Sequence, residues 1–440
     1  MAGLAKLVFV LFVSVYLAQA KHEEYDGHSL YEIRVNDYEE VTKVNDIIDD
    51  MNLDRWSFAI PGQDGLVLVA EGMKPLFENA LNDIGIEYKI ETANIKEKLD
   101  LEDKLLAEAA RRSNYTRSGA GIDLNVIHRW GVVDQYLTDL ARRFPNIVRV
   151  VSGGRTFQGR DIKYLRISSN NFQTSSKPII VIQSLLHARE WVTLPVALQA
   201  IHKLVIDVTD QDLIRDADWI IIPIANPDGY EFSHTNNRFW RKNRRTGFGI
   251  CAGVDLNRNH AFNWGTASSN SACQDTFHGP SAFSEPETQM KRNIINQYRS
   301  RIALYIDVHS HGSMILFGFG NRQLPSNALL LNLVGVQMAQ RIDAVKWPSH
   351  RNYRVGNIVA VIGYTASGGS SDYVQTMIGS RLSYTFELPA YRGQGGLNGF
   401  LVEPAFIRQA GVETWEGIKE GARYVIRNRL TLMNDEIANE

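Results

Sequence analysis

The sequence predicts an α/β protein in two parts. Residues 118–440 are expected to form a doubly wound, mixed and mainly parallel sheet with helices on both faces, because apolar strand patterns and helical patterns alternate there. The residues before them are expected to form a small ferredoxin-like α+β domain, because their periods follow the order β-α-β-β-α-β. Apolar and charged contents of 44% and 22% are ordinary for a soluble globular protein.

The first twenty residues have a different composition. Lys6 is followed by an apolar run from Leu7 to Val13, and the segment closes with Ala18-Gln19-Ala20. This pattern is typical of a secretory signal peptide over residues 1–20, cleaved after the last alanine. The alternative, a membrane anchor, is disfavoured because the apolar run is shorter than the roughly 20 residues that a bilayer requires. We therefore expect a secreted, extracellular protein.

The first domain is expected to end in an exposed linker. Residues 95–112 have the pattern of a charged helix, and small polar residues and glycines follow at 113–121. A trypsin-like protease that cuts after Arg117 or Arg112 would separate a segment 21–117 from a domain 118–440. Within the segment, the predicted strands are 30–35, 56–60, 66–69 and 86–90, and the predicted helices are 41–51 and 73–84.

Charge is distributed unevenly between the two parts. Residues 21–117 contain 22 acidic and 12 basic residues, although the net charge of the whole chain is only −2. The rest of the chain is therefore basic, and opposite charges favour docking of the two parts on each other. The alternative is that the acidic residues only solvate the first domain.

Three chemically interesting side chains follow predicted strands of the second domain. His187, His309 and Glu387 each come shortly after an apolar run. In open α/β sheets, sites lie at the carboxyl ends of the strands. The predicted strands are 147–151, 162–167, 179–182, 219–224, 302–306 and 383–386, and the predicted helices are 130–144, 191–205, 327–342 and 413–430.

The stretch His187-Ala188-Arg189-Glu190-Trp191 places an imidazole and a carboxylate three positions apart. A catalytic zinc ion takes three protein ligands and leaves one position open. His309, in the sequence Ile306-Asp307-Val308-His309, is the best placed third ligand. The pair alone is a weak signal, because either side chain has common structural roles, so the assignment depends on the segments that follow.

Further segments, in this order, give the pair its context. Residues 236–244 form a basic and aromatic stretch, 254–259 read Val-Asp-Leu-Asn-Arg-Asn, 363–372 are a glycine-rich loop with a tyrosine, and 385–388 place a carboxylate at a strand end. Together with the His-x-x-Glu pair and the last histidine, they resemble the secreted zinc metallocarboxypeptidases of the carboxypeptidase A/B type. The resemblance covers nearly the whole chain, including an N-terminal activation segment, and it implies one Zn²⁺ per chain, bound by His187, Glu190 and His309.

The resemblance also implies roles at the reaction centre. Glu387 would be the general base that takes a proton from water and passes it to the leaving amine. Arg241 would stabilise the developing oxyanion. Asp255 would bond the second nitrogen of His187 and orient the ring.

Substrate contacts follow from the same resemblance. Asn257, Arg258 and Tyr364 would hold the terminal carboxylate, because a guanidinium matches a carboxylate bidentately. Arg189 would lie in a neighbouring subsite. The remaining residues expected to contact substrate are Ser371, His311 and Phe400.

Ser371 is expected at the floor of the specificity pocket, where relatives that remove lysine or arginine carry an acid. Asp372 aligns instead with a structural aspartate, and the other aligned pocket positions are uncharged (Gly320, Val359 and Ala366). The sequence therefore favours an apolar or aromatic C-terminal residue, with a breadth that the serine leaves open. His311 stands where relatives usually have tyrosine, and the loop from Pro389 to Phe400 is longer, so the outer subsites are expected to differ.

The only cysteines, Cys251 and Cys273, are expected to form a disulfide, because a lone pair in an exported protein most often does so; two free thiols are the alternative. Asn114 lies in the one glycosylation sequon.

Other classes of protein fit less well. The glycine spacing at 154–161 lacks the Lys-Ser/Thr ending of a phosphate loop, and the chain has no Gly-x-Ser-x-Gly elbow. We expect a monomer that acts on peptide and protein C-termini, with no nucleic-acid or membrane partner. Proteinaceous carboxypeptidase inhibitors are further expected partners, and the digestive lumen is a plausible location. A basic-residue carboxypeptidase and a non-catalytic peptide-binding homologue are the alternatives.

Overall fold

The computed structural model covers the whole chain and describes residues 21–113, 121–207, 209–379, 381–389, 397–429 and 432. The expected signal peptide, the sequon at Asn114 and the cleavage position at Arg117 lie outside the described residues. Among the described residues, every helix is too short or too polar to span a bilayer.

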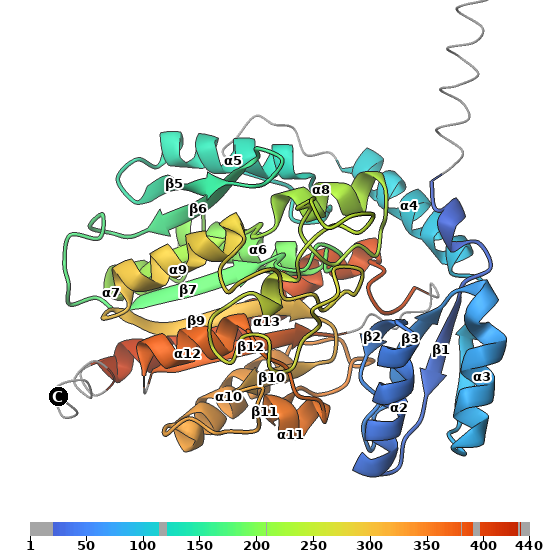
Figure 1. Cartoon of the computed structure of the whole chain (residues 1–440). Coiled ribbons are helices and arrows are strands. Elements are labelled where there is room, and N and C mark those ends of the chain that lie inside the picture. Colours follow the sequence, from blue (N-terminus) through green and yellow to red (C-terminus); the bar gives the residue numbers. More distant parts are fainter. Residues whose placement is uncertain are drawn as a thin grey trace, which may run out of the picture.

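The N-terminal part has the expected β-α-β-β-α-β order (Figure 1). Its sheet has the strand order β2-β3-β1-β4, and all the neighbouring strands are antiparallel. Alternate apolar residues, such as Tyr31 and Ile33, pack with Val41 and Val44 into a separate small core. The ferredoxin-like prediction is confirmed. The elements are β1 (Ser29–Ile33), α2 (Tyr38–Asp50), β2 (Asp54–Ser57), β3 (Gly65–Val69), α3 (Lys74–Asp83) and β4 (Tyr88–Thr92).

Helix α4 (Ile95–Arg112) leads from this domain toward the linker. Asn94 caps it, because its side chain accepts a hydrogen bond from the Lys96 amide at 3.1 Å. Ile95, Leu99 and Glu102 share one buried face, as the spacing i, i+4, i+7 requires. The two apolar residues belong to a core that contains residues of both domains. Helix α4 therefore helps to join the first domain to the second.

The second domain is built on an eight-stranded sheet with the order β11-β10-β12-β9-β7-β8-β6-β5. The central strands β12, β9, β7 and β8 are parallel, and antiparallel pairs occur toward both edges. The mixed, mainly parallel prediction is confirmed. The strands are β5 (Val148–Arg155), β6 (Asp161–Ile167), β7 (Ile179–Ser184), β8 (Asp218–Ile222), β9 (Ile302–Ser310), β10 (Met314–Phe317), β11 (Arg354–Asn357) and β12 (Leu382–Leu388).

Helices cover both faces of this sheet (Figure 1). Because successive side chains of a strand point to opposite faces, Ile180 and Ile182 join one core and Ile179 and Val181 join the other. The first core contains residues of α5 (Trp130–Arg143), α6 (Thr193–Val205), α10 (Ala328–Asp343) and α13 (Pro404–Arg427), and the second contains residues of α9 (Pro286–Tyr298) and α12 (Ser370–Ile378). The remaining short helices are α7 (Asp212–Asp216), α8 (Pro227–Thr235) and α11 (Ile358–Ile362).

The largest difference from the predicted helix bounds is at α13, and one predicted loop is partly helical. Helix α13 was expected from Glu413 but begins at Pro404, and glycines inside it hid the helical pattern. A Cβ at Gly417 would lie 2.7 Å from the Ile342 side chain, so this glycine allows α13 to pack closely on α10. The end of the predicted loop 363–372 is also helical, because α12 begins at Ser370.

Candidate active site

The carboxyl ends of β7, β9 and β12 bring the predicted site residues together. His187 lies just beyond β7, His309 is the penultimate residue of β9, and Glu387 is the penultimate residue of β12. Glu387 and His309 are register partners on neighbouring parallel strands. The sheet itself therefore sets the separation of these side chains, as expected for the carboxyl edge of an α/β sheet.

His187, Glu190 and His309 form one buried group that could hold a metal ion. Nδ1 of His187 lies 2.7 Å from Oε1 of Glu190, and Nδ1 of His309 lies 3.0 Å from Oε2 of Glu190. The two Nδ1 atoms lie 3.0 Å from each other. Two imidazole nitrogens and a carboxylate oxygen directed at one point are a donor set that fits Zn²⁺.

Asp255 holds the outer nitrogen of the first histidine. Its Oδ1 lies 3.2 Å from Nε2 of His187 and accepts a hydrogen bond from the Asn257 amide at 2.8 Å. Its Oδ2 accepts hydrogen bonds from Nε and Nη2 of Arg241 at 3.1 and 3.0 Å. Burial opposes ionisation of Asp255, but Arg241 and His187 outweigh it and hold its pKa well below the ordinary value. The predicted link between Asp255 and His187 is present, and it also orients Arg241.

The outer nitrogen of the second histidine also faces a carboxylate, which sequence reasoning missed. Nε2 of His309 lies 3.3 Å from Oδ2 of Asp307. Asp307 is completely buried. The sequence did contain a signal for Asp307, because residues two apart on a strand, such as Asp307 and His309, point to the same face of the sheet.

Glu387 lies beside this group with a perturbed carboxyl. Burial, the largest effect, raises its pKa to about 8; His309 and Arg241 act in the opposite direction, and Glu190 adds to the rise. A divalent cation in the site would lower this pKa. A carboxyl whose proton affinity depends on nearby charge is suited to accepting and returning a proton.

The residues predicted to hold a substrate carboxylate line the same cavity. Among the described residues, Nε of Arg258 has no hydrogen-bond partner although it is buried. Nη1 of Arg258 donates to the Asn257 carbonyl at 2.9 Å, and Oδ1 of Asn257 accepts from the Ser370 amide at 2.8 Å. The fold therefore positions Arg258 and leaves N–H donors of its guanidinium, Nε–H among them, for a ligand.

The floor of the cavity contains paired hydroxyl groups. Oγ of Ser371 and Oγ1 of Thr385 are 2.8 Å apart. Asp372 is committed to the protein, because its Oδ2 accepts a hydrogen bond from the Gly320 amide at 2.8 Å. Burial raises the pKa of Asp372 to about 6. Ser371, Thr385, Gly320 and Ala366 line the cavity, as do Ile358 and Ile362; Val359, which was expected there, is instead buried beside it.

The predicted outer residues Arg189, His311 and Phe400 also line the cavity. The Arg189 guanidinium lies 4.3 Å from the centre of the Phe400 ring, and the His311 ring centre is 4.9 Å from that of Phe400. The three side chains form one wall.

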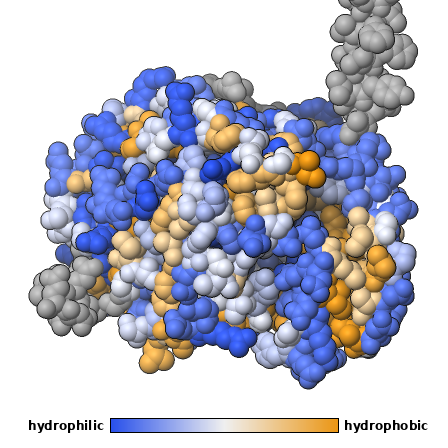
Figure 2. Space-filling model, viewed as in Figure 1, coloured by the Kyte–Doolittle hydropathy of each residue, from blue (hydrophilic) through white to orange (hydrophobic). Residues whose placement is uncertain are grey.

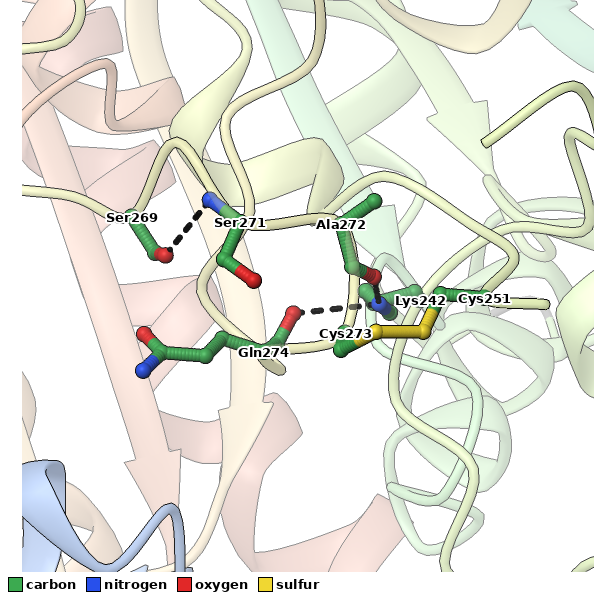
Figure 3. The surroundings of a disulfide bond; sticks show 7 residues. All are labelled: Lys242, Cys251, Ser269, Ser271, Ala272, Cys273 and Gln274. Carbon is green, nitrogen blue, oxygen red and sulfur yellow. Dashed lines mark hydrogen bonds between the residues drawn. A yellow bond between two sulfur atoms is a disulfide. The ribbon is translucent and has the colours of Figure 1, made fainter. Parts of the chain in front are cut away.

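A disulfide fixes a loop that lies next to Arg189. Cys251 and Cys273 are bonded, as predicted (Figure 3). The buried Lys242 ammonium donates to the Ala272 and Gln274 carbonyls at 2.6 and 3.0 Å. Gln274 and the two residues after it line the cavity. The disulfide and Lys242 therefore position a cavity wall.

The ferredoxin-like domain covers the cavity mouth. Oδ1 of Asp54 accepts a hydrogen bond from Nη1 of Arg189 at 2.6 Å. The ring of Trp56 packs against that of Phe400, with centres 5.3 Å apart. Phe58 packs against Tyr364 at 5.0 Å. These contacts occupy side chains expected to bind substrate.

Helix α4 adds a buried ion pair to this interface. Arg238 and Glu102 are each about 1% exposed. Nε and Nη2 of Arg238 donate to the two Glu102 oxygens at 2.8 and 3.0 Å, and the Val402 amide donates to Glu102 at 2.6 Å. Acidic side chains of the first domain thus meet arginines of the second, as the charge distribution predicted. Other acidic residues, such as those along α2, lie on the hydrophilic surface (Figure 2), so solvation accounts for part of the excess.

Family comparisons agree with this geometry. The chain matches the family model described as zinc carboxypeptidase over residues 133–417 and the carboxypeptidase activation peptide over residues 31–102. A carboxypeptidase B of Helicoverpa zea is 42% identical, over 95% of this chain and 97% of that protein. A carboxypeptidase A2 of Mus musculus is 31% identical, over 94% of this chain and 97% of that protein.

Solved structures show the same similarity. The crystal structure of a carboxypeptidase A from Helicoverpa armigera is 57% identical and superimposes with a TM-score of 0.90, covering 92% of this chain and 99% of that one. Bovine thrombin-activatable fibrinolysis inhibitor, solved in complex with a tick carboxypeptidase inhibitor, is 26% identical with a TM-score of 0.62, covering 69% and 99%. The chain therefore belongs to the zinc carboxypeptidase family, as the zymogen, with its activation peptide, of a zinc-dependent exopeptidase.

Proposed function

We propose that the activated enzyme prefers peptides with an apolar or aromatic C-terminal residue. The observation that carries this proposal is the uncharged floor of the pocket. Ser371 and Thr385 bond to each other there, and Ile358 and Ile362 supply apolar surface. Among the described residues named at the pocket floor, only Asp372 offers a carboxylate to a buried lysine or arginine side chain of a substrate, and its Oδ2 already accepts a hydrogen bond from the Gly320 amide.

The serine–threonine pair favours a broad rather than a narrow preference. Hydroxyl groups can both donate and accept hydrogen bonds, so this pair is compatible with a polar as well as an apolar substrate side chain. The named relatives include both A-type and B-type enzymes, so the pocket residues, rather than overall similarity, support the choice.

Catalysis is proposed to use the residues at the sheet edge. His187, Glu190 and His309 bind Zn²⁺, which when bound polarises the scissile carbonyl and acidifies water. Arg258, with Asn257 and Tyr364, holds the substrate carboxylate.

Two further side chains act on the reacting atoms. Glu387 takes a proton from the attacking water and delivers it to the leaving amine. Arg241, oriented by Asp255, stabilises the negative charge that develops on the carbonyl oxygen. Both side chains line the cavity that also contains Arg258, so one bound peptide can reach all of them.

The zymogen is proposed to be secreted and activated by a trypsin-like protease that cuts after Arg117 or Arg112. Arg112 is the last residue of α4, and its side chain is exposed. The cut separates a segment 21–117 from a monomeric catalytic domain 118–440. Proteinaceous inhibitors are proposed as partners of the opened cavity, by analogy with the bovine relative solved with a tick inhibitor.

The test compares kcat/KM for matched peptides that end in Phe, Leu, Lys or Glu, after trypsin treatment. We expect Phe and Leu to exceed Lys by at least about tenfold, because a charge without a partner must otherwise be buried. A preference for Lys would reject the pocket assignment and leave a B-type enzyme as the better description.

A further inference from the structure

The histidine on β9 has a structural support that its motif does not include. Nε2 of His309 and Oδ2 of Asp307 are 3.3 Å apart. Both atoms are buried, and neither has a hydrogen-bond partner among the described residues. A hydrogen bond from Nε2–H of His309 to the Asp307 carboxylate would satisfy both atoms, and 3.3 Å is close to the length that such a bond requires.

Neighbouring strands and helices hold the Asp307 carboxylate in place. Its Oδ1 accepts a hydrogen bond from Nε2 of Gln183 at 2.7 Å. Gln183 and Asp307 are register partners on β7 and β9, so the sheet fixes this pair.

A buried cation also interacts with the carboxylate. Lys291, on α9, is about 1% exposed, and its ammonium donates to Oγ of Ser370 at 2.6 Å. The Tyr305 hydroxyl also lies 2.6 Å from this oxygen. The charge of Lys291 attracts the Asp307 carboxylate.

Each of the two metal-binding histidines therefore faces a buried carboxylate with a cation near it. Behind His187 stand Asp255 and the cation of Arg241; behind His309 stand Asp307 and the cation of Lys291. The outer contacts have nearly equal lengths, 3.2 and 3.3 Å. Carboxylates behind metal-bound histidines fix the tautomer and the ring orientation and raise the basicity of the ligand.

We infer that Asp307 is a positioning residue of the zinc site, which holds Nε2–H of His309 and so presents Nδ1 to the metal. This inference rests on the proposed ligand set. Asp307 touches neither substrate nor the reacting atoms in this account, so its effect appears first in metal affinity.

The test measures the zinc dissociation constant of the full-length chain by competition with a chromogenic chelator. We expect Asp307→Ala to raise this constant about 10- to 100-fold, and Asp307→Asn, which keeps an acceptor without the charge, to raise it less. Asp218→Asn is the matched control, because Asp218 is also a buried carboxylate of the sheet but lies at the first residue of β8. An unchanged constant in Asp307→Ala overturns the inference.

Two more measurements distinguish a wrong role for Asp307 from a wrong zinc-ligand set and from a variant that fails to fold. If His309→Ala binds zinc as tightly as the unmodified chain, the ligand set itself is wrong; if His309→Ala loses zinc and Asp307→Ala does not, only the role of Asp307 is wrong. Should Asp307→Ala not fold, Asp307→Asn is unfolded thermally with and without chelator. If Asp307 positions the ligand, the difference between the melting temperatures without and with chelator is smaller in Asp307→Asn than in the unmodified chain. If both melting temperatures fall by the same amount, the positioning role is contradicted.

Discussion

The ion pair between Glu102 and Arg238 is expected to control how tightly the activation segment remains bound after the linker is cut. Both side chains are about 1% exposed, and three hydrogen bonds from Arg238 and the Val402 amide converge on the Glu102 carboxylate. The substitution Glu102→Ala removes the carboxylate that accepts all three of these hydrogen bonds. The cut zymogen then buries the Arg238 charge without its partner whenever the segment is bound.

The size of the effect follows from the burial. Removing one partner of a buried ion pair costs about 3–5 kcal/mol. Arg238 keeps hydrogen bonds to the Arg189 and Phe400 carbonyls at 2.9 and 2.6 Å, which places the loss near the lower end of that range. At about 1.4 kcal/mol per tenfold, the dissociation constant of the cut segment rises by more than about 100-fold.

The assay uses trypsin-cut zymogen in serial dilution, with peptidase activity per mole of protein reporting the dissociated fraction. Asp100→Ala is the matched control on the same helix, because Asp100 is half exposed and, among the described residues, forms an ion pair with Lys96 alone. An exposed i, i+4 pair contributes about 0.3–0.5 kcal/mol, so this variant should behave almost as the unmodified chain. If Glu102→Ala dissociated no more readily than Asp100→Ala, the buried pair would not be what retains the segment.

Three further outcomes are expected. Glu387→Gln should lower kcat by more than about 100-fold while zinc content stays the same, and a variant that lost its zinc would instead indicate a ligand role. Ser371→Asp should raise the ratio of kcat/KM for C-terminal Lys over Phe by more than about tenfold, because it supplies a buried counter-charge; an unchanged ratio would move the specificity floor elsewhere. Burial raises the pKa of Glu413 to about 7, so its stabilising contribution is complete below the ordinary value near 4.5 and is lost as pH rises through about 7. Between pH 4.5 and 7 the free energy of unfolding, measured by thermal unfolding, should therefore fall by about 3 kcal/mol more in the unmodified chain than in Glu413→Gln. Equal pH profiles of the two proteins would contradict this role of Glu413.

Local patterns of apolar residues were sufficient to predict the strands that carry the site residues. The apolar runs before His187, His309 and Glu387 predicted three strands, and the parallel sheet brings their carboxyl ends together. The zinc-binding group could be predicted because its two histidines lie at or just beyond such ends, Glu190 follows His187 by three residues, and the later segments occur in the order of the family that the chain resembles. By contrast, the start of α13 could not be predicted, since Gly411 and Gly417 are in the helix for contact with neighbouring helices rather than for helical propensity.

Contacts between segments that are distant in the sequence could not be predicted from the sequence patterns. The charge distribution indicated that the two domains dock, but not that Asp54 would meet Arg189 or that Glu102 would be buried. These pairings depend on how α4 and β2 lie on the second domain. Asp307 was missed for another reason: it is two residues from His309 on one strand and was readable from the period, but a carboxylate inside an apolar strand has many structural roles.

The central claim is tested most directly by mass spectrometry of a peptide ending in Leu-Phe, incubated with the chain before and after trypsin treatment. The account predicts stepwise loss of single C-terminal residues only after trypsin treatment, inhibition by a chelator and recovery when zinc is restored. Internal cleavage, or C-terminal trimming that persists in the presence of the chelator, would contradict it.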